Sequence, residues 1–309
     1  MKKPKRPFPD ELMFLKNRKA KQATTNASLE GKVCVITGAT SGVGYEALKR
    51  LAQSGAQLYF IARNVTKANQ VQAELREKYH CESTYFIADF ANLEAVKEVA
   101  STLLSQVPKI DVLINCAGLH STKKTWTSDG YETVFAVNHL ASFLFTMLLL
   151  PRMKESAPSR ILQINSEGHR FNGLDPNDLD WRKRRYTGLK GYGASKTAQL
   201  MTVWELNDQL IDSGVTINAM HPGDVRTNIG QNNGWLYRTF SKFFIMPFLK
   251  DPAISGEAIY YLAAEPSLAT TSGKFFHLTI EEKPAKHALD RVVGARIYKQ
   301  SKIMVGLSE

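Results

Sequence analysis

The chain has 309 residues, of which 43% are hydrophobic, and a formal net charge of +11. This hydrophobic content can form a substantial core and excludes a disordered chain, and no uninterrupted apolar run reaches the roughly 18 residues of a transmembrane helix. The three cysteines contain no Cys-x-x-Cys pair and the seven histidines no His-Glu-x-x-His pattern, so we expect no metal site.

The N-terminal segment carries more than half of the excess positive charge. Residues 1–21 contain eight Lys or Arg residues against Asp10 and Glu11, a net charge of +6. The segment lacks the apolar stretch of a secretory signal. It could contact anionic lipid or nucleic acid, or it could be a solvated leader, and we expect the solvated leader.

From residue 33 onwards, short apolar runs alternate with longer amphipathic ones. The apolar runs predict buried strands at 33–37, 57–62, 83–88, 111–115, 160–165, 215–220 and 274–278. Helical patterns cover 43–54, 65–79, 92–106, 129–154 and 192–212. This alternation predicts the α/β class, with a single Rossmann-type, doubly wound parallel sheet of about seven strands and helices on both faces. We expect one domain over 31–280, a mobile basic extension over 1–30 and a C-terminal extension over 281–309.

A glycine-rich turn, Thr37-Gly-Ala-Thr-Ser-Gly-Val-Gly44, follows the first predicted strand. Glycines at this place let backbone N–H groups approach a pyrophosphate, and the N-terminus of the next helix adds partial positive charge. The second strand ends at Arg63, where an NAD-selective site normally places a carboxylate for the ribose 2′-hydroxyl. Because a guanidinium suits a 2′-phosphate, we predict NADP(H) as the cofactor.

The sequence Tyr192-Gly-Ala-Ser-Lys196 places a tyrosine and a lysine on the same face of a predicted helix. A free tyrosine, with a pKa of about 10, is a poor proton donor or acceptor at neutral pH. We expect the lysine ammonium to lower that pKa toward the range where general acid–base catalysis is effective. The fifth predicted strand ends at Ser166, so these side chains lie near carboxyl ends of strands, where ligands of open α/β sheets bind.

The Thr-Gly-x-x-x-Gly-x-Gly spacing and the Tyr-x-x-x-Lys pair resemble the short-chain dehydrogenase/reductase family, over roughly residues 30–280. The long interval between Ser166 and Tyr192 is similar to that of retinol dehydrogenases and related NADP-dependent carbonyl reductases. The resemblance implies catalytic roles for Ser166, Tyr192, Lys196 and Asn138. Asn138 would anchor a water that relays protons to the lysine.

The same resemblance implies cofactor contacts along much of the chain. In Asn115-Cys-Ala-Gly118 a cysteine replaces the family's second asparagine, and we expect Asn115 and Gly118 to keep their roles. The residues expected to contact the cofactor are Gly38, Thr40, Ser41, Gly42, Val43, Gly44, Arg63, Asp89, Phe90, Asn115, Ala117, Gly118, Tyr192, Lys196, Pro222, Gly223, Val225 and Thr227.

The segment over 228–250 is the expected substrate lid, and it is rich in aromatic residues such as Trp235, Phe243 and Phe248. Such a lid suits a lipophilic retinoid, steroid, long-chain aldehyde or quinone. We therefore predict an NADP(H)-dependent oxidoreductase that interconverts a carbonyl and an alcohol. A non-catalytic NADP(H)-binding regulator or scaffold is the alternative, and epimerases and dehydratases of the same fold also stay open. We expect a cytoplasmic protein without a specific nucleic-acid partner; membrane contact on the cytosolic side and a homodimer are left open.

Overall fold

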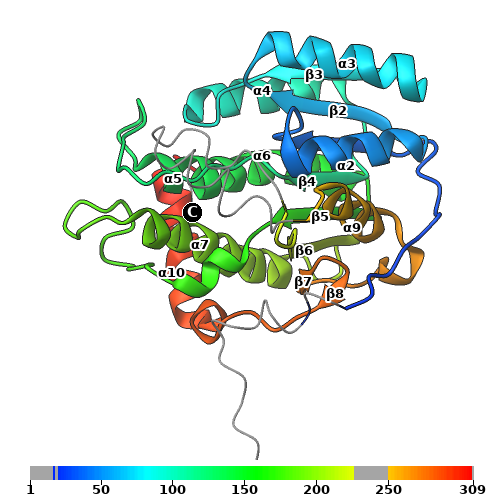
Figure 1. Cartoon of the computed structure of the whole chain (residues 1–309). Helices are drawn as coiled ribbons and strands as arrows, with labels where there is room; N and C mark the ends of the chain where they lie inside the picture. The colour runs from blue at the N-terminus through cyan, green and yellow to red at the C-terminus, as the bar shows by residue number, and fades with distance from the viewer. Residues whose placement is uncertain (1–16, 18–19, 226–249, 308–309) are drawn as a thin grey trace, which may run out of the picture.

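The computed structural model describes residues 17, 20–225 and 250–307 (Figure 1). Its centre is one eight-stranded sheet with the strand order β3-β2-β1-β4-β5-β6-β7-β8. Strands β1 to β7 pair in parallel, and β8 pairs antiparallel with β7. The strands are β1 (Val33–Thr37), β2 (Gln57–Ala62), β3 (Ser83–Ile87), β4 (Val112–Asn115), β5 (Ser159–Ile164), β6 (Val215–His221), β7 (Phe275–His277) and β8 (Ile280–Glu281).

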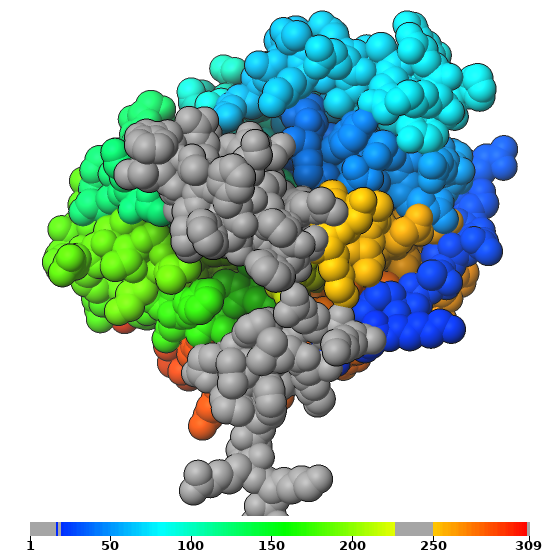
Figure 2. All heavy atoms as spheres, viewed as in Figure 1, coloured from blue at the N-terminus to red at the C-terminus, as the bar shows by residue number. Residues whose placement is uncertain are grey.

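Helices cover both faces of the sheet, which is why its central strands are apolar on both sides. One layer contains α2 (Gly42–Gln53), α3 (Val65–Tyr79) and α9 (Ala253–Ala264), and Figure 2 shows the surface of α9 adjoining that of α2. The opposite layer contains α4 (Leu93–Gln106), α6 (Ser142–Glu155), α7 (Gly188–Gln209) and α10 (Arg291–Met304). In β1, Val33 and Val35 pack into the second layer, whereas Cys34 and Ile36 pack into the first.

The predicted fold class is confirmed, with eight strands in place of about seven. Each predicted strand is found within one residue of its expected ends. The helix expected over 129–154 instead begins with α5 (Thr133–Phe135), continues through a π-helical turn at Ala136–Ala141 and ends with α6. The short strand β8 carries no sequence signal of its own, because a two-residue strand has no periodicity to detect.

The helix Thr133–Glu155 is long and apolar enough to cross a membrane, judged by length and composition alone. Within the protein, 83% of its most apolar window is buried, as in the core helix of a soluble domain. A count of uninterrupted apolar residues misses this helix because Asn138, Ser142 and Thr146 interrupt the run.

The described part of the N-terminal segment lies against the end of the sheet. The Gln22 Oε1 atom accepts a hydrogen bond from the Thr279 backbone N–H at 3.0 Å, and the Ala23 N–H donates to Thr279 Oγ1 at 2.8 Å. Leu29 is buried. The segment from residue 20 to residue 30 is therefore held by specific contacts.

The C-terminal helix α10 packs along α7. The Ser301 hydroxyl lies 2.7 Å from His139 Nε2, in the π-helical turn, and the Tyr131 hydroxyl donates to the Met304 carbonyl at 2.8 Å. Because α10 contacts both α7 and the π-helical turn, it supports two of the elements that carry predicted site residues.

Candidate active site

The predicted site residues gather at the carboxyl edge of the sheet. Strand β1 lies between β2 and β4, so the strand order reverses between β1 and β4. In open α/β sheets, ligands bind outside the carboxyl ends of the strands at such a reversal. The glycine turn follows β1, and Ser166 follows β5 two strands away.

The glycine turn is shaped by two close approaches of backbone. Gly38 has a φ of +68°, and a Cβ there would lie 2.8 Å from the Ala117 Cα. A Cβ at Gly44 would lie 2.4 Å from the Gly38 carbonyl oxygen. Ser41 precedes α2 without a side-chain cap, and no acidic residue occupies the first turn. The first N–H groups of α2 are therefore available to an anion, as the site of a dinucleotide pyrophosphate requires.

Two threonines and an asparagine hold the loop after β4 beside this turn. Thr37 Oγ1 accepts hydrogen bonds from the N–H groups of Cys116 and Ala117, each at 3.0 Å. Asn115 Nδ2 donates to Thr146 Oγ1 of α6 at 2.7 Å. The Asn115 side chain thus ties β4 to α6. Sequence reasoning did not assign Thr37 this bridging role, because its partners are distant in the chain.

Arg63 lies exposed at the end of β2. The next residue, Asn64, caps α3 by accepting a hydrogen bond from the Lys67 N–H at 2.9 Å. Within residues 20–225 and 250–307, no hydrogen bond or ion pair engages the Arg63 guanidinium. Its five N–H donors are therefore available to a ligand at the end of β2.

Asp89 and Phe90 follow β3, and their side chains point in different directions, one to solvent and one into the core. The Asp89 side chain is exposed and accepts a hydrogen bond from the Ala91 N–H at 3.0 Å, which shapes the loop. The Phe90 ring is buried against Phe145, with ring centroids 5.7 Å apart. Only the backbone of Phe90 is left for the predicted cofactor contact.

Ser166 and Tyr192 meet because two glycines allow α7 to press on the turn after β5. The Ser166 hydroxyl accepts a hydrogen bond from the Gly168 N–H at 3.0 Å. A Cβ at Gly168 would lie 2.6 Å from the Tyr192 ring, and a Cβ at Gly193 would lie 2.4 Å from the Asn172 carbonyl oxygen. Sequence reasoning missed Gly168, although its place two residues after Ser166 is a visible signal.

The Lys196 side chain is buried, and its ammonium donates hydrogen bonds to acceptors other than Tyr192. Its Nζ donates to the Ile164 carbonyl and to Gln199 Oε1, each at 3.0 Å, and lies 5.8 Å from the centroid of the Tyr192 ring. Gln199 in turn donates through Nε2 to the Asn138 carbonyl. Gln199, which the sequence analysis did not single out, therefore connects Lys196 with Asn138.

Asn138 lies in the π-helical turn and fastens the loop after β4. Its Oδ1 accepts from the Leu119 N–H at 2.8 Å, and its Nδ2 donates to the Leu119 carbonyl at 3.0 Å. Its own carbonyl is occupied by Gln199. Asn138, the residue expected to anchor a relay water, therefore has its backbone carbonyl bonded to the Gln199 side-chain amide.

Burial controls the proton affinities of the catalytic pair. It raises the pKa of Tyr192 to about 12, with the Ser166 hydrogen bond acting in the opposite direction. It lowers the pKa of Lys196 to about 8. The expectation of a lowered Tyr192 pKa is therefore wrong for this structure, because burial dominates and the ammonium points to Gln199 and Ile164. A phenol with a raised pKa keeps its proton at neutral pH and can therefore donate it.

The loop after β6 brings three further predicted residues to the same edge. The Pro222 carbonyl accepts a hydrogen bond from Ser255 Oγ at 2.6 Å. Gly223 has a φ of +81°, a conformation that favours glycine. Val225 is buried and pairs with Lys250 in an isolated bridge. Thr227 and positions 228–249 of the expected lid lie outside the described residues.

A glycine turn at the switch point, followed by Ser166, Tyr192 and Lys196 at the neighbouring strand ends, defines a dinucleotide-dependent oxidoreductase of the Rossmann type. The chain belongs to the short-chain dehydrogenase family, because the sequence model described as "short chain dehydrogenase" matches residues 32–235. It is an oxidoreductase that interconverts carbonyl and alcohol groups with a nicotinamide dinucleotide cofactor. The uncapped start of α2 and the close approach of Gly38 to Ala117 fit such a cofactor.

Known proteins are similar to nearly the whole chain. Retinol dehydrogenase 13 of Homo sapiens is 35% identical over 290 residues, which cover 92% of this chain and 87% of the relative. A putative daunorubicin C-13 ketoreductase, DnrU, of Streptomyces sp. (strain C5) is 32% identical over 286 residues, which cover 93% of this chain and 96% of that relative. A solved structure of a putative uncharacterized protein from Mycobacterium paratuberculosis superposes with a TM-score of 0.74 at 25% identity, covering 93% of this chain and 99% of that one.

Proposed function

We propose that the enzyme uses NADP(H) and acts on a lipophilic carbonyl or alcohol. The exposed Arg63 guanidinium at the end of β2 carries the cofactor proposal. The residues beside it, Ala62 and Asn64, bring no carboxylate that would select the ribose 2′-hydroxyl of NAD. A guanidinium binds a phosphate through charge-assisted, bidentate hydrogen bonds.

The lipophilic substrate is supported by two relatives and by the composition of the expected lid. The relatives are named for retinol and for the C-13 ketone of daunorubicin. The segment over 228–250 is rich in aromatic residues. Apolar and aromatic linings bind substrates of this kind through buried area, while a few polar groups fix their orientation.

The catalytic residues of this chain have separable tasks in the proposed reaction. The bound nicotinamide supplies or accepts the hydride. Ser166 and Tyr192 hold the substrate oxygen by hydrogen bonds, and Tyr192 donates its proton to that oxygen when a carbonyl is reduced. Lys196, Gln199 and Asn138 form a buried hydrogen-bonded chain behind Tyr192. These hydrogen bonds, with the one to the Ile164 carbonyl, hold the Lys196 ammonium 5.8 Å from the centroid of the Tyr192 ring.

The cofactor proposal is tested by the change Arg63→Gln. We expect the ratio of kcat/KM with NADPH to kcat/KM with NADH to fall at least tenfold, with the loss in KM for NADPH, because a bidentate phosphate contact is removed. Arg76→Gln, at an exposed position in the last turn of α3, is the control and should leave the ratio unchanged. An unchanged ratio in Arg63→Gln would refute the NADP(H) preference.

The substrate proposal is tested with a panel of retinoid, steroid, long-chain aldehyde and quinone substrates. NADPH absorbance is followed for the wild type and for Tyr192→Phe, and NADPH binding is titrated in parallel. Turnover that is lost in Tyr192→Phe while NADPH still binds supports the enzyme. Tight NADPH binding without turnover across the panel would favour a non-catalytic regulator that uses the same fold.

A further inference from the structure

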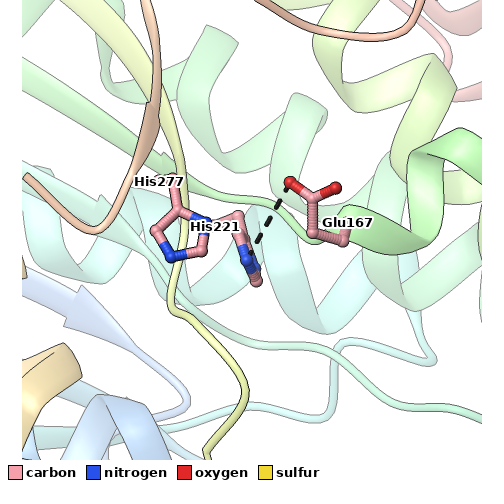
Figure 3. Close-up of side chains that lie close together, drawn as sticks. All are labelled: Glu167, His221 and His277. Atoms are coloured by element: carbon pink, nitrogen blue, oxygen red, sulfur yellow. Dashed lines mark ion pairs between the residues drawn. The ribbon is translucent and has the colours of Figure 1, made fainter. Parts of the chain in front are cut away.

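Three potential metal ligands from distant parts of the chain converge behind the catalytic edge (Figure 3). Glu167 follows Ser166 in the turn after β5, His221 ends β6 and His277 ends β7. His221 and His277 are direct partners in the parallel register of β6 and β7. Their rings lie 4.7 Å apart between centroids, at 77° to each other.

Each of the three side chains directs a buried atom into this cluster without a hydrogen-bond partner among the described residues. The atoms are Glu167 Oε1, His221 Nε2 and His277 Nδ1. Glu167 Oε1 and His221 Nε2 are 3.9 Å apart, which is too far for a hydrogen bond. The two histidines are only 3% and 2% exposed, so bulk water does not satisfy them. Buried polar atoms of this kind normally have a partner, which indicates a bound species between them.

The charges around the cluster favour a cation. Arg170 binds Glu167 and Glu282 together, and all three side chains are largely withdrawn from solvent. Asp224 and Lys250 add one charge of each sign near His277, so the carboxylates exceed the cations by one when Glu167 is ionised. Burial raises the pKa of Glu167 to about 7, and a bound cation would favour its ionised form. Glu282 Oε2 also lies 3.8 Å from His277 Nδ1. A buried charge needs a compensating partner, and a divalent cation between the imidazoles and Glu167 supplies one.

We propose that Glu167, His221 and His277 form a binding site for a divalent transition metal, with Zn²⁺ as the first candidate. Two imidazole nitrogens and one carboxylate oxygen are a donor set that Zn²⁺ accepts. The histidine spacing predicted no metal site, because sheet pairing and not sequence distance brings these ligands together. The site adjoins the expected cofactor contacts, because Glu167 follows Ser166 and His221 precedes Pro222.

Metal binding requires two local adjustments. The three donor atoms lie within 4.8 Å of one another, whereas tetrahedral bonds of about 2.1 Å place donors about 3.4 Å apart. Side-chain rotations that shorten the widest separation by about 1.4 Å close this difference. His221 Nδ1 accepts from the Gly223 N–H at 3.3 Å, which keeps the ring proton on Nε2. Binding through Nε2 moves that proton to Nδ1 and releases Gly223, so metal binding is coupled to the loop after β6.

A buried water is the competing occupant, because it fits the observed separations without adjustment and without a tautomer change. The experiment therefore has to distinguish a metal from a water. The full-length protein is stripped with a chelator, dialysed and titrated with Zn²⁺ in competition with a chromophoric chelator. Co²⁺ is titrated separately, since its visible absorption reports the coordination geometry. Melting temperature is measured with and without Zn²⁺.

We expect one tight equivalent of Zn²⁺ in the wild type, a tetrahedral Co²⁺ spectrum and a raised melting temperature. His277→Gln should weaken binding at least tenfold and abolish the thermal shift, and the control His80→Asn, at an exposed position, should change neither. Glu167→Gln is the second variant if His277→Gln does not fold. Binding in these variants equal to that of the wild type, or no stoichiometric binding in the wild type, would overturn the proposal and leave a water in the cluster.

Discussion

The proposed catalytic side chains are positioned by neighbouring residues. Gly168 leaves room for the Tyr192 ring against the turn that carries Ser166, and Gln199 occupies the space between Lys196 and Asn138. Tyr192 and Lys196 were predicted from their spacing. The direction of the Lys196 ammonium was not, because it depends on acceptors from β5 and from the next turn of α7.

Gly168→Ala should separate Tyr192 from Ser166. The new Cβ would lie 2.6 Å from the Tyr192 ring, so the ring or the turn must move. We expect kcat to fall about 100-fold, since small misplacements of catalytic groups cost this much, while the Kd for NADPH stays within a few fold. Gly294→Ala, in α10, is the control. A Gly168→Ala enzyme with wild-type kcat would show that the close approach is irrelevant to catalysis.

Gln199→Leu should affect catalysis through Lys196. The change removes an acceptor 3.0 Å from the Lys196 ammonium, so it destabilises the charged form and lowers the Lys196 pKa further below its ordinary value. We expect kcat to fall about tenfold and the Lys196-dependent limb of the pH–rate profile to move to lower pH. Thr202→Val, one turn further along α7, is the control. An unshifted profile would limit Gln199 to a packing role.

At the scale of elements, the sequence predicted strands β1 to β7 and the helical segments up to α7, but it did not predict α9 or α10. A hydrophobic pattern with a period of 2 or 3.6 residues can be recognised without the tertiary structure, because it records which faces of a strand or helix are buried. The π-helical turn at Ala136–Ala141 was not predictable, since its residues suit an α-helix equally well. The π-helical turn lies where α5, α7 and α10 pack around Asn138 and His139.

The start of α5 depends on Glu132, whose two carboxylate oxygens accept from the N–H groups of Val134 and Phe135 at 3.0 and 2.8 Å. Glu132 is fully buried. We expect Glu132→Ala to lower the free energy of unfolding by about 1–3 kcal/mol, because a helix cap and two buried donors lose their partner. Urea unfolding measures this change in the free energy of unfolding. Glu94→Ala, in the exposed first turn of α4, should stay within about 0.5 kcal/mol, and equal effects of the two changes would contradict the capping role.

At the scale of the whole molecule, the fold tolerates a buried lysine at the site. Burial lowers the pKa of Lys196 from 10.5 to about 8, so the folded state disfavours the charged form. The unfolded chain binds more protons than the folded one between these values, and stability gains from this group as the pH rises through that window. Below pH 8, the full free-energy cost of burying the charged lysine lowers the stability of the folded state.

Lys196→Met should therefore stabilise the protein while abolishing activity. We expect the free energy of unfolding at pH 7 to rise by on the order of 1 kcal/mol, the unpaired Ile164 carbonyl and Gln199 amide offsetting part of the gain. The difference from the wild type should be constant from pH 6 to pH 8 and smaller at pH 9, measured by urea unfolding. A less stable variant at pH 7 would show that the hydrogen bonds of Lys196 outweigh its desolvation.

The sequence by itself determined the family and the sheet with helices on both faces, and it predicted the candidate residues of the cofactor and catalytic sites. These follow from local periodicity and from motifs that lie within a few residues of each other. Only the tertiary structure decided the partners of Lys196 and the convergence of Glu167, His221 and His277. Such contacts join strands and helices far apart in the chain, and burial, which sets the pKa values of Tyr192 and Lys196, is a property of the packed molecule.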